Sequence, residues 1–236
     1  MQALILADGS FPENEQRRNL LKASSKIICC DGAVKKLVEF GLEPFAIVGD
    51  MDSISDELQD KYSDRIFKSD DQETNDLTKA VEFCIKNGFD EIAILGATGL
   101  REDHTLGNIS LLADYAISLK SVCLLTDFGR IDSIKAGVSV NDFFETGLDE
   151  MAPEVCSTRN GLNTVARFRS FSGQQVSIFS LNTECHISAL ELKYPLENRC
   201  LTSWWQGTLN EAISDEFTIS IDKGSLLVYR LNITNR

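Results

Sequence analysis

The sequence predicts an α/β protein in which a doubly wound, mostly parallel sheet domain precedes a smaller antiparallel β-sandwich domain. In the first half, short continuous apolar runs alternate with segments of helical periodicity, which is typical of parallel strands covered on both faces. From about Phe128 the helical periodicity gives way to short alternating runs separated by turn residues. The 236 residues are enough for two domains, which we place at 1–127 and 128–236.

The first half predicts six strands joined by helices. The apolar runs expected as strands are 3–7, 27–30, 45–48, 65–68, 92–95 and 122–125. The segments expected as helices are one that starts near Ser10, followed by 33–40, 56–61, 77–85 and 106–118. Ser10 and Glu13 have the spacing of a capping box, and Gly41 and Gly88 follow helical segments, where glycine commonly ends a helix.

The second half predicts short antiparallel strands. The alternating runs are 166–169, 175–179, 189–193, 217–221 and 225–229. The stretch 139–164 is polar, acidic at first and only weakly periodic, so we expect a long loop there.

Composition restricts the possible partners. The formal net charge of −13 argues against nucleic acid, because phosphate backbones are bound by clustered Lys and Arg. An acidic protein can still bind a nucleotide through Mg²⁺, and its charge suits an organic cation. No apolar stretch reaches the ~18 residues of a membrane span, and the N-terminus lacks a basic leader. Seven Cys without a Cys-x-x-Cys pair favour reduced thiols in the cytoplasm over a zinc site.

Acidic residues follow several predicted strands. Asp50 and Asp52 come directly after 45–48, while Asp8 and Asp31 follow two other apolar runs. Since parallel strands end at one edge of a sheet, these carboxylates are candidates for a Mg²⁺-phosphate site. We expect the Ser53 hydroxyl to cap the next turn. The alternative for Asp50 and Asp52 is a solvated strand-to-helix turn.

A polar segment opens the helix at 77–85. Asn75 is a good N-cap, and Asp76 suits the positive end of the helix dipole. If this helix end faces the site, Asp76 adds a further carboxylate. Lys79, one turn later, can reach either a phosphate or Asp76.

The loop 96–104 is rich in glycine and charge. Its glycines allow the backbone to approach a phosphate, and Arg101 can grip phosphate oxygens. Asp103 can orient metal or substrate, and we expect His104 to begin the next helix. The loop matches neither a Walker A motif nor the dinucleotide fingerprint. The alternative is an ordinary connection capped by Asp103.

Trp204 and Trp205 lie in the β half of the chain. Paired indoles of this kind are usually core or interface anchors. In a protein with an acidic site, they are also candidates for stacking on a cationic aromatic ligand.

Four segments, taken together in order and spacing, resemble those of thiamine pyrophosphokinases. They are 31–32 (Asp-Gly), 49–53 (Gly-Asp-Met-Asp-Ser), 75–80 (Asn-Asp-Leu-Thr-Lys-Ala) and 96–108, of which the last is the most specific. The segments 192–196 and 214–217 also look like that family's thiamine-binding domain, so the resemblance covers nearly the whole chain.

The resemblance implies transfer of the pyrophosphoryl group of ATP to the hydroxyl of thiamine, giving thiamine diphosphate and AMP. It further implies Mg²⁺ dependence and a homodimer that holds thiamine between the α/β domain of one subunit and the β domain of its mate. The implied catalytic residues are Asp50, Asp52, Asp76 and Asp103, the first three as metal ligands. Those implied around the nucleotide are Asp31, Asn75, Lys79, Arg101 and His104, and those for thiamine are Trp204, Trp205 and Ser214.

Three positions depart from the family pattern. Asn75 stands where Thr is usual, Leu100 replaces the second glycine of Gly-Gly-Arg-x-Asp, and Asp215 replaces the Asn of Ser-Asn-Glu. These differences concern thiamine contacts more than the reaction. Two rival functions remain open at this point: a pyrophosphokinase for another heterocyclic alcohol, and a thiamine or nucleotide sensor without turnover.

Overall fold

The structure, a computed structural model, describes residues 1–69, 71, 73–138, 153–157 and 163–232. Internal contacts divide the chain into two compact units. The first unit comprises Met1–Leu111 and Ser118–Asp127, and the second comprises Leu112–Ile117 and Phe128–Arg236.

The first unit is built on a parallel sheet. Its strands are β1 (Gln2–Leu6), β2 (Ile27–Cys30), β3 (Ala46–Gly49), β4 (Ile66–Lys68), β5 (Glu91–Leu95) and β6 (Ser121–Leu125). They lie in the order β6-β5-β1-β2-β3-β4, and every pairing within this set is parallel. Apart from the first residues of some strands and the short edge strand β4, their side chains are buried, as continuous apolar runs predict.

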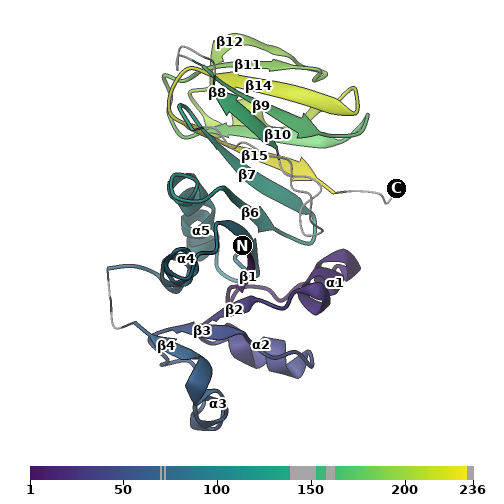
Figure 1. Cartoon of the computed structure of the whole chain (residues 1–236). Helices are drawn as coiled ribbons and strands as arrows, with labels where there is room; N and C mark the ends of the chain where they lie inside the picture. The colour runs from purple at the N-terminus through teal and green to yellow at the C-terminus, as the bar shows by residue number, and fades with distance from the viewer. Residues whose placement is uncertain (70, 72, 139–152, 158–162, 233–236) are drawn as a thin grey trace. The chain divides into compact units, whose positions relative to one another are not determined.

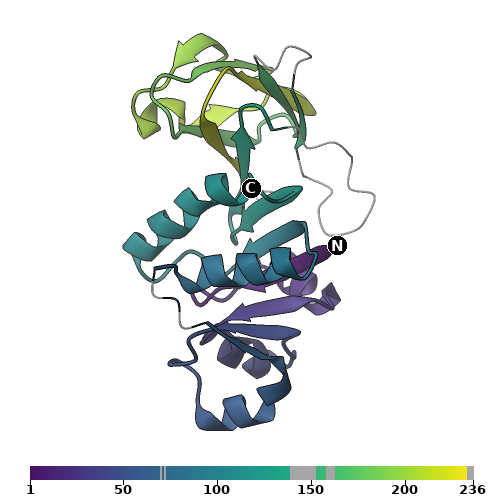
Figure 2. The ribbon, with the colours of Figure 1, turned by 60° about the vertical axis from the view of Figure 1, so that its left-hand side comes forward.

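Helices cover both faces of this sheet. They are α1 (Glu15–Ala23), α2 (Ala33–Glu39), α3 (Asp56–Lys61), the 3₁₀ turn η1 (Ser63–Arg65), α4 (Asp76–Lys86) and α5 (Glu102–Tyr115). Figure 1 shows α1 and α2 on one side of the strands and α4 and α5 on the other, and Figure 2 brings α4 and α5 to the front. The predicted doubly wound, mostly parallel sheet is therefore confirmed.

Two predicted helix starts are wrong. Helix α1 begins at Glu15 rather than near Ser10, because the side chain of Asn14 accepts the N–H of Gln16 and acts as the N-cap. The Asp127 carboxylate accepts the Glu13 and Asn14 N–H groups at 2.9 and 3.1 Å, which holds this turn from a distant part of the chain. Helix α5 begins at Glu102, two residues before the predicted start at His104.

The predicted cap of the third helix is also wrong. Helix α3 begins at Asp56, directly after Ser55. Instead of capping it, the Ser53 hydroxyl donates to Oδ1 of Asp52 at 2.9 Å. Ser53 thus contributes to the acidic loop rather than to the helix.

The connections reverse direction between β1 and β5. From β1 the chain proceeds outward through β2, β3 and β4, whereas β5 and β6 lie on the other side of β1. The loops after β1 and β5 meet at this point, where the Gly9 N–H donates to the Gly96 carbonyl at 2.6 Å. A Cβ on Gly9 would lie 2.4 Å from that oxygen, so only glycine permits the approach. Ligands of open α/β sheets bind at such a switch point.

The second unit contains two antiparallel sheets. Its elements are β7 (Gly129–Lys135), β8 (Glu154–Ser157), β9 (Thr164–Arg169), β10 (Gln175–Ser180), β11 (His186–Leu190), β12 (Leu196–Cys200), the 3₁₀ turn η2 (Trp204–Gly207), β13 (Asn210–Glu211), β14 (Glu216–Ile221) and β15 (Ser225–Leu231). The sheet orders are β13-β10-β15-β7 and β12-β11-β14-β9-β8. Residues from both sheets share one core, in which the rings of Phe168 and Phe217 stack at 4.8 Å. The antiparallel β-sandwich is therefore confirmed.

The prediction of a loop throughout 139–164 is wrong at Glu154–Ser157. These residues form β8, which pairs with β9 along the edge of its sheet. Their weak alternation gives little signal, because only Val155 is buried among the side chains described there. Residues 139–152 and 158–162 lie outside the described residues.

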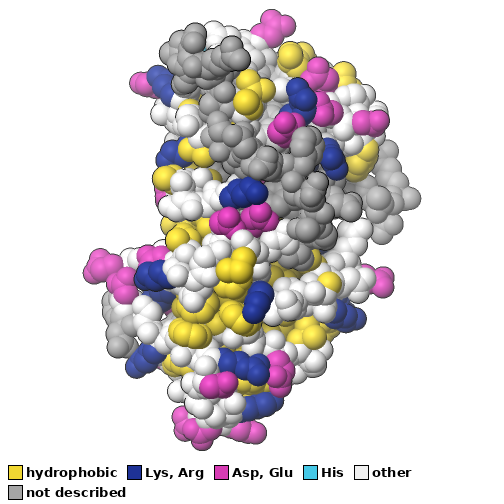
Figure 3. Space-filling model, in the orientation of Figure 1, with side chains coloured by type: hydrophobic (Ala, Val, Ile, Leu, Met, Phe, Trp, Pro, Cys, Tyr) yellow, Lys and Arg dark blue, Asp and Glu magenta, His cyan; other side chains and the backbone are white. Residues whose placement is uncertain are grey.

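On the face drawn in Figure 3, Lys and Arg side chains are interspersed with Asp and Glu side chains. The net charge of −13 is therefore not gathered into one acidic surface on that side. Across the described ranges, no helix is long and apolar enough to cross a membrane.

Candidate active site

A cleft of about 460 Å³ opens at the carboxyl ends of the parallel strands. Its walls come from the loops after β1, β2, β3 and β5 and from the N-terminal turns of α4 and α5. The volume falls within the range of small-molecule sites. The predicted site residues that line it are Asp31, Asp50, Asn75, Asp76, Lys79, Arg101 and His104.

Three carboxylates converge at the cleft. Oxygens of Asp31, Asp50 and Asp52 all lie within 4.8 Å of one another. Asp50 and Asp52 flank Met51, whose φ of 72° turns the loop back on itself. The Asp52 N–H donates to Asp50, and the Ser53 N–H donates to Asp31, both at 3.3 Å. The loop after β3 is thereby folded against the end of β2.

Asp31 is the most constrained of the three. Its side chain is 4% exposed, and its Oδ1 is buried without a hydrogen-bond partner in the described part of the chain. Burial raises the pKa of Asp31 to about 6, against a lowering by Ser53, and repulsion from Asp76 and Asp50 adds to the rise. A buried carboxylate oxygen with no donor, beside two more carboxylates, suits a hard divalent cation such as Mg²⁺.

Asp76 lies at the cleft but outside this group of three. Its Oδ1 is 3.1 Å from Nζ of Lys79, whose side chain is 6% exposed. Burial lowers the pKa of Lys79, but the contacts with Asp76 outweigh it and the net shift is upward. The geometry thus groups Asp31, rather than Asp76, with the predicted metal ligands Asp50 and Asp52.

Arg101 and Asp103 form an exposed pair. Nε of Arg101 lies 3.1 Å from Oδ1 of Asp103, and the hydrogen bonds from Arg101 and the His104 N–H lower the pKa of Asp103. Arg101 lines the cleft, whereas Asp103 does not. Leu100 lies between Gly99 and Arg101 and has a φ of 114°. This backbone conformation is strained for a residue that carries a Cβ.

Two amide side chains connect the N-terminus of α4 to the second turn of α5. Asn75 caps α4 by accepting the Thr78 N–H at 2.9 Å, and its amide group donates to Asn108 at 3.2 Å. Asn108 in turn donates to the Ala97 carbonyl at 2.9 Å. Asn75, which departs from the usual Thr, therefore connects α4 to the glycine-rich loop.

The predicted thiamine residues lie in the second unit. Trp204 and Trp205 form the exposed turn η2, with 46% and 75% of their surface accessible. Trp204 packs edge-on against Phe179, with ring centroids 6.0 Å apart. Gln206 holds the turn by accepting the N–H groups of Thr202 and Ser203 at 2.8 and 3.0 Å.

Ser214 is engaged with its own chain. Its hydroxyl donates to the Glu216 carbonyl and accepts the Glu216 N–H at 3.4 Å. The structure thus leaves both tryptophans accessible and uses Ser214 to shape the start of β14.

Sequence reasoning did not single out Asn108, at the cleft, or Lys36, which does not line the cleft but contacts a loop that does. Lys36 contacts the loop after β1, and Asn108 lines the cleft. Asn108 closes the motif 96–108, and that position was its only signal. Lys36 gave no signal, because a Lys in a helix is ordinarily solvated.

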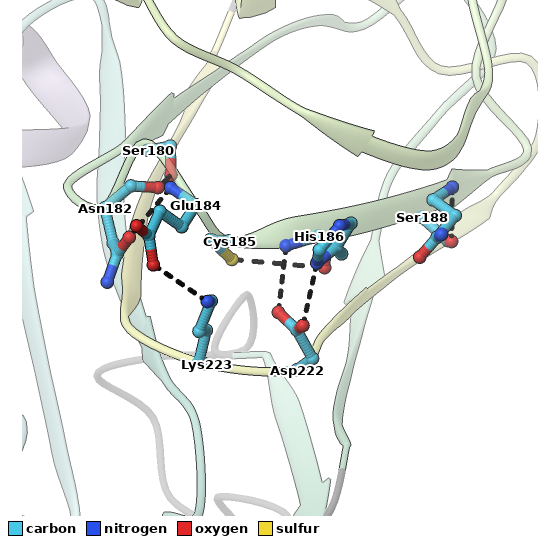
Figure 4. A network of polar contacts seen from close by, with 9 residues as sticks. Ser180, Asn182, Glu184, Cys185, His186, Ser188, Asp222 and Lys223 are labelled. Atoms are coloured by element: carbon cyan, nitrogen blue, oxygen red, sulfur yellow. Dashed lines mark hydrogen bonds and ion pairs between the residues drawn. The ribbon is translucent and has the colours of Figure 1, made fainter.

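His186 belongs to a polar network in the second unit (Figure 4). Its Nδ1 and its backbone N–H lie 2.9 and 2.8 Å from the two carboxylate oxygens of Asp222. Lys223, next along the turn, reaches Glu184 at 3.0 Å. These contacts join the start of β11 to the turn between β14 and β15, which is a structural role.

Comparisons with known proteins point to one family. The sequence model of a family described as "Thiamin pyrophosphokinase, catalytic domain" matches residues 17–124, and that of "Thiamin pyrophosphokinase, substrate-binding domain" matches 161–229. The chain is similar to "Thiamin pyrophosphokinase 1" of Caenorhabditis elegans, with 24% identity over 94% of this chain and 85% of the relative. A second relative, "Thiamine pyrophosphokinase 1" of Oryza sativa subsp. japonica, is 35% identical over 42% of this chain and 47% of its own length.

Solved structures share the fold. The crystal structure of thiamine pyrophosphokinase from Bacillus subtilis superposes with a TM-score of 0.71 at 21% identity, covering 98% of this chain and 99% of that one. The thiamin pyrophosphokinase from Candida albicans gives a TM-score of 0.70 at 17% identity, covering 98% and 89%.

Proposed function

The chain belongs to the thiamin pyrophosphokinase family, and from this premise we propose how its residues carry out the reaction. The enzyme is a kinase-type transferase of thiamine diphosphate biosynthesis, with thiamine as substrate and ATP as co-substrate. It transfers the pyrophosphoryl group of ATP to the thiamine hydroxyl and releases AMP.

Asp31, Asp50 and Asp52 are the proposed Mg²⁺ ligands. The observation that carries this assignment is the convergence of their oxygens within 4.8 Å, together with the unpartnered Oδ1 of Asp31. Mg²⁺ bound there would neutralise charge that develops on the phosphate oxygens. No Lys or Arg in the described ranges lies within ion-pair distance of these three carboxylates, so their charge is available to a cation.

Basic groups and backbone donors position the phosphates. Lys79 and Arg101 line the cleft from two sides, and Asn75 and His104 lie beside them. Asp103 fixes the guanidinium of Arg101 through two hydrogen bonds, so we assign it the orientation of Arg101. Asp76, at the helix end beside Lys79, is placed to orient the attacking hydroxyl or to accept its proton.

The direct test is the reaction itself. With purified chain, Mg²⁺ and ATP, AMP release should require thiamine and should be absent with a pterin alcohol of similar size. Release of ADP instead of AMP, or equal release with the pterin, would contradict the proposed reaction. Binding of thiamine without any turnover would point to a sensor.

Thiamine is proposed to bind at an interface between two copies of the chain. Trp204 and Trp205 are accessible, and Leu209 close by is 78% exposed, although large apolar side chains are usually covered. A second subunit would cover this surface and bring the tryptophans to a thiazolium or pyrimidine ring, which an indole face attracts.

Subunit mixing tests the shared site. Assayed at a thiamine concentration well below the wild-type KM, Asp52→Asn and Trp205→Ala should each be poorly active alone. If each site takes its acidic residues from one subunit and its tryptophan from the other, co-refolding the two variants should restore about a quarter of wild-type activity. Activity no higher than the mean of the two variants, or a monomer by analytical ultracentrifugation, would contradict the shared site.

The enzyme is further proposed to act in the cytoplasm. Cys29 and Cys30 are adjacent and buried in β2, and burial raises the pKa of both thiols. Buried thiols of this kind persist in a reducing compartment. Fractionation with an antibody against the chain would place it.

A further inference from the structure

Lys36, in α2, makes three contacts with the loop that follows β1. Its Nζ lies 2.7 Å from Oδ1 of Asp8, 3.0 Å from the Asp8 carbonyl and 2.8 Å from the Gly9 carbonyl. An ammonium has three protons, so these contacts use its full donor capacity. Lys36 does not line the cleft, whereas both Asp8 and Gly9 do.

The loop held by Lys36 is packed directly on the glycine-rich loop. Besides the contact between Gly9 and Gly96, the Ser10 N–H donates to the Thr98 carbonyl at 2.9 Å, and the Ser10 hydroxyl reaches the Gly99 carbonyl at 3.3 Å. The two backbones touch with no room for a side chain between them. A shift of Asp8 or Gly9 is therefore passed to Thr98 and Gly99, which line the cleft.

Charge pairing at the cleft is selective. Asp8, Asp31, Asp50 and Asp76 line it, and Asp52 lies beside them. Lys79 pairs with Asp76, and Lys36 pairs with Asp8. The remaining three carboxylates are those whose oxygens converge. Two of the five acidic groups therefore form ion pairs with lysines, and the three without an ion pair in the described part of the chain are the ones that can hold a cation.

We propose that Lys36 is a positioning residue that keeps Asp8 out of the set of metal ligands and fixes the loop after β1 against the glycine-rich loop 96–104. The inference rests on the proposed function, because it assigns the remaining carboxylates to Mg²⁺. Loss of Lys36 is therefore expected to strengthen cation binding and to weaken catalysis at the same time. The extra negative charge attracts Mg²⁺, while the released loop misplaces the phosphates.

The experiment compares Lys36→Met with three variants. Titration calorimetry of the nucleotide-free chain with MgCl₂ should give about threefold to tenfold tighter binding for Lys36→Met. The KM for MgATP should rise about tenfold. In Lys36→Met combined with Asp8→Asn, the cation affinity should return to the wild-type value, because the unmatched charge is gone. Lys36→Arg should keep wild-type cation affinity.

Lys35→Met is the matched control, since it removes the same charge from an exposed neighbouring position of α2. It should change neither quantity more than about twofold. Unchanged or weaker Mg²⁺ binding in Lys36→Met, or no recovery with Asp8→Asn, would overturn the inference. Should Lys36→Met fail to fold, Lys36→Gln removes the charge while keeping an amide donor, and the same cation titration applies. If wild-type chain lacks thiamine-dependent AMP release, the proposed function fails instead, and the cation titration still decides on Lys36.

Discussion

The acidic cleft of the first unit and the tryptophan turn η2 of the second unit differ in how completely one chain builds them. At the cleft, buried strands and hydrogen bonds from backbone N–H groups hold charged groups that would otherwise repel one another. At η2, the turn is held by Gln206, yet its two indoles face outward. Burying charged groups costs free energy, so they need surrounding backbone that holds them in place. Aromatic side chains can remain exposed until a partner covers them.

The largest effect is expected from a substitution in the acidic cleft, which should slow the reaction without affecting thiamine binding. Asp52→Asn removes one carboxylate charge from the group of three and should lower kcat by about a thousandfold, in line with other losses of preorganised charge stabilisation. Thiamine binding, measured by quenching of tryptophan fluorescence, should change little. Asp60→Asn, at an exposed position of α3, is the control and should retain activity. Near-normal kcat for Asp52→Asn would refute the metal assignment.

Replacing the tryptophans tests the second region. Trp205→Ala should raise the KM for thiamine about tenfold, because loss of ring stacking costs about 1–3 kcal/mol, while the KM for ATP stays unchanged. Trp204→Ala should also lower stability, since Trp204 packs against Phe179. Steady-state kinetics with each substrate varied, and thermal unfolding of both variants, distinguish these roles. Equal rises in both KM values would remove the thiamine assignment of Trp205.

A smaller effect concerns the burial of Asp31. Its pKa is raised from 3.8 to about 6, so the fold disfavours the charge that Asp31 carries above pH 6. In Asp31→Asn this penalty is absent, and asparagine tolerates the positive φ of 35°. Without Mg²⁺, the free energy of unfolding of the variant near pH 7.5 should exceed that of the wild type by about 1–2 kcal/mol. This is less than the full pKa shift implies, because solvent screens the charges of the neighbouring carboxylates.

The sign of the pH dependence follows from proton binding. Between pH 4 and 6 the folded chain binds a proton at Asp31 more tightly than the unfolded chain, so the wild type loses stability as the pH rises through this range. The advantage of Asp31→Asn should therefore vanish near pH 4, be complete above pH 6, and reverse in saturating Mg²⁺. Urea unfolding at several pH values measures it, and an advantage that grows toward acid would contradict the raised pKa.

The smallest effect compares two exposed leucines with positive φ. Leu100 at the cleft has a φ of 114°, outside the ordinary left-handed region, whereas Leu209 beside η2 has a φ of 60°, inside it. The Leu100→Gly substitution should raise the free energy of unfolding by up to about 1 kcal/mol, since relief of backbone strain exceeds the entropy cost of glycine. The Leu209→Gly substitution should not raise the free energy of unfolding. Urea unfolding of both variants tests the difference. An equal increase in the free energy of unfolding would show that the backbone at Leu100 is no more strained than the backbone at Leu209.

Much of the site could be predicted from the sequence because its residues follow strands. Asp31 and Asp50 each follow a buried apolar run, and parallel strands must end at one edge. The motif 96–108 likewise placed Arg101 and His104 at that edge. The sequence left open whether Lys79 faces a phosphate or Asp76, and it did not predict the pair of Asp103 and Arg101; the structure shows both pairs. Pairing depends on side-chain directions that strand order alone does not set.

By itself, the sequence determined the alternation of buried strands and helices, the change to antiparallel strands, and the family to which the chain belongs. Periodicity and motif spacing are local properties, so they can be read without coordinates. Only the tertiary structure decided that Asp31 joins Asp50 and Asp52, that Lys36 holds Asp8, and that Asp127 sets the start of α1. These contacts join residues far apart in the chain, and their energies depend on distance and burial, which exist only in the fold.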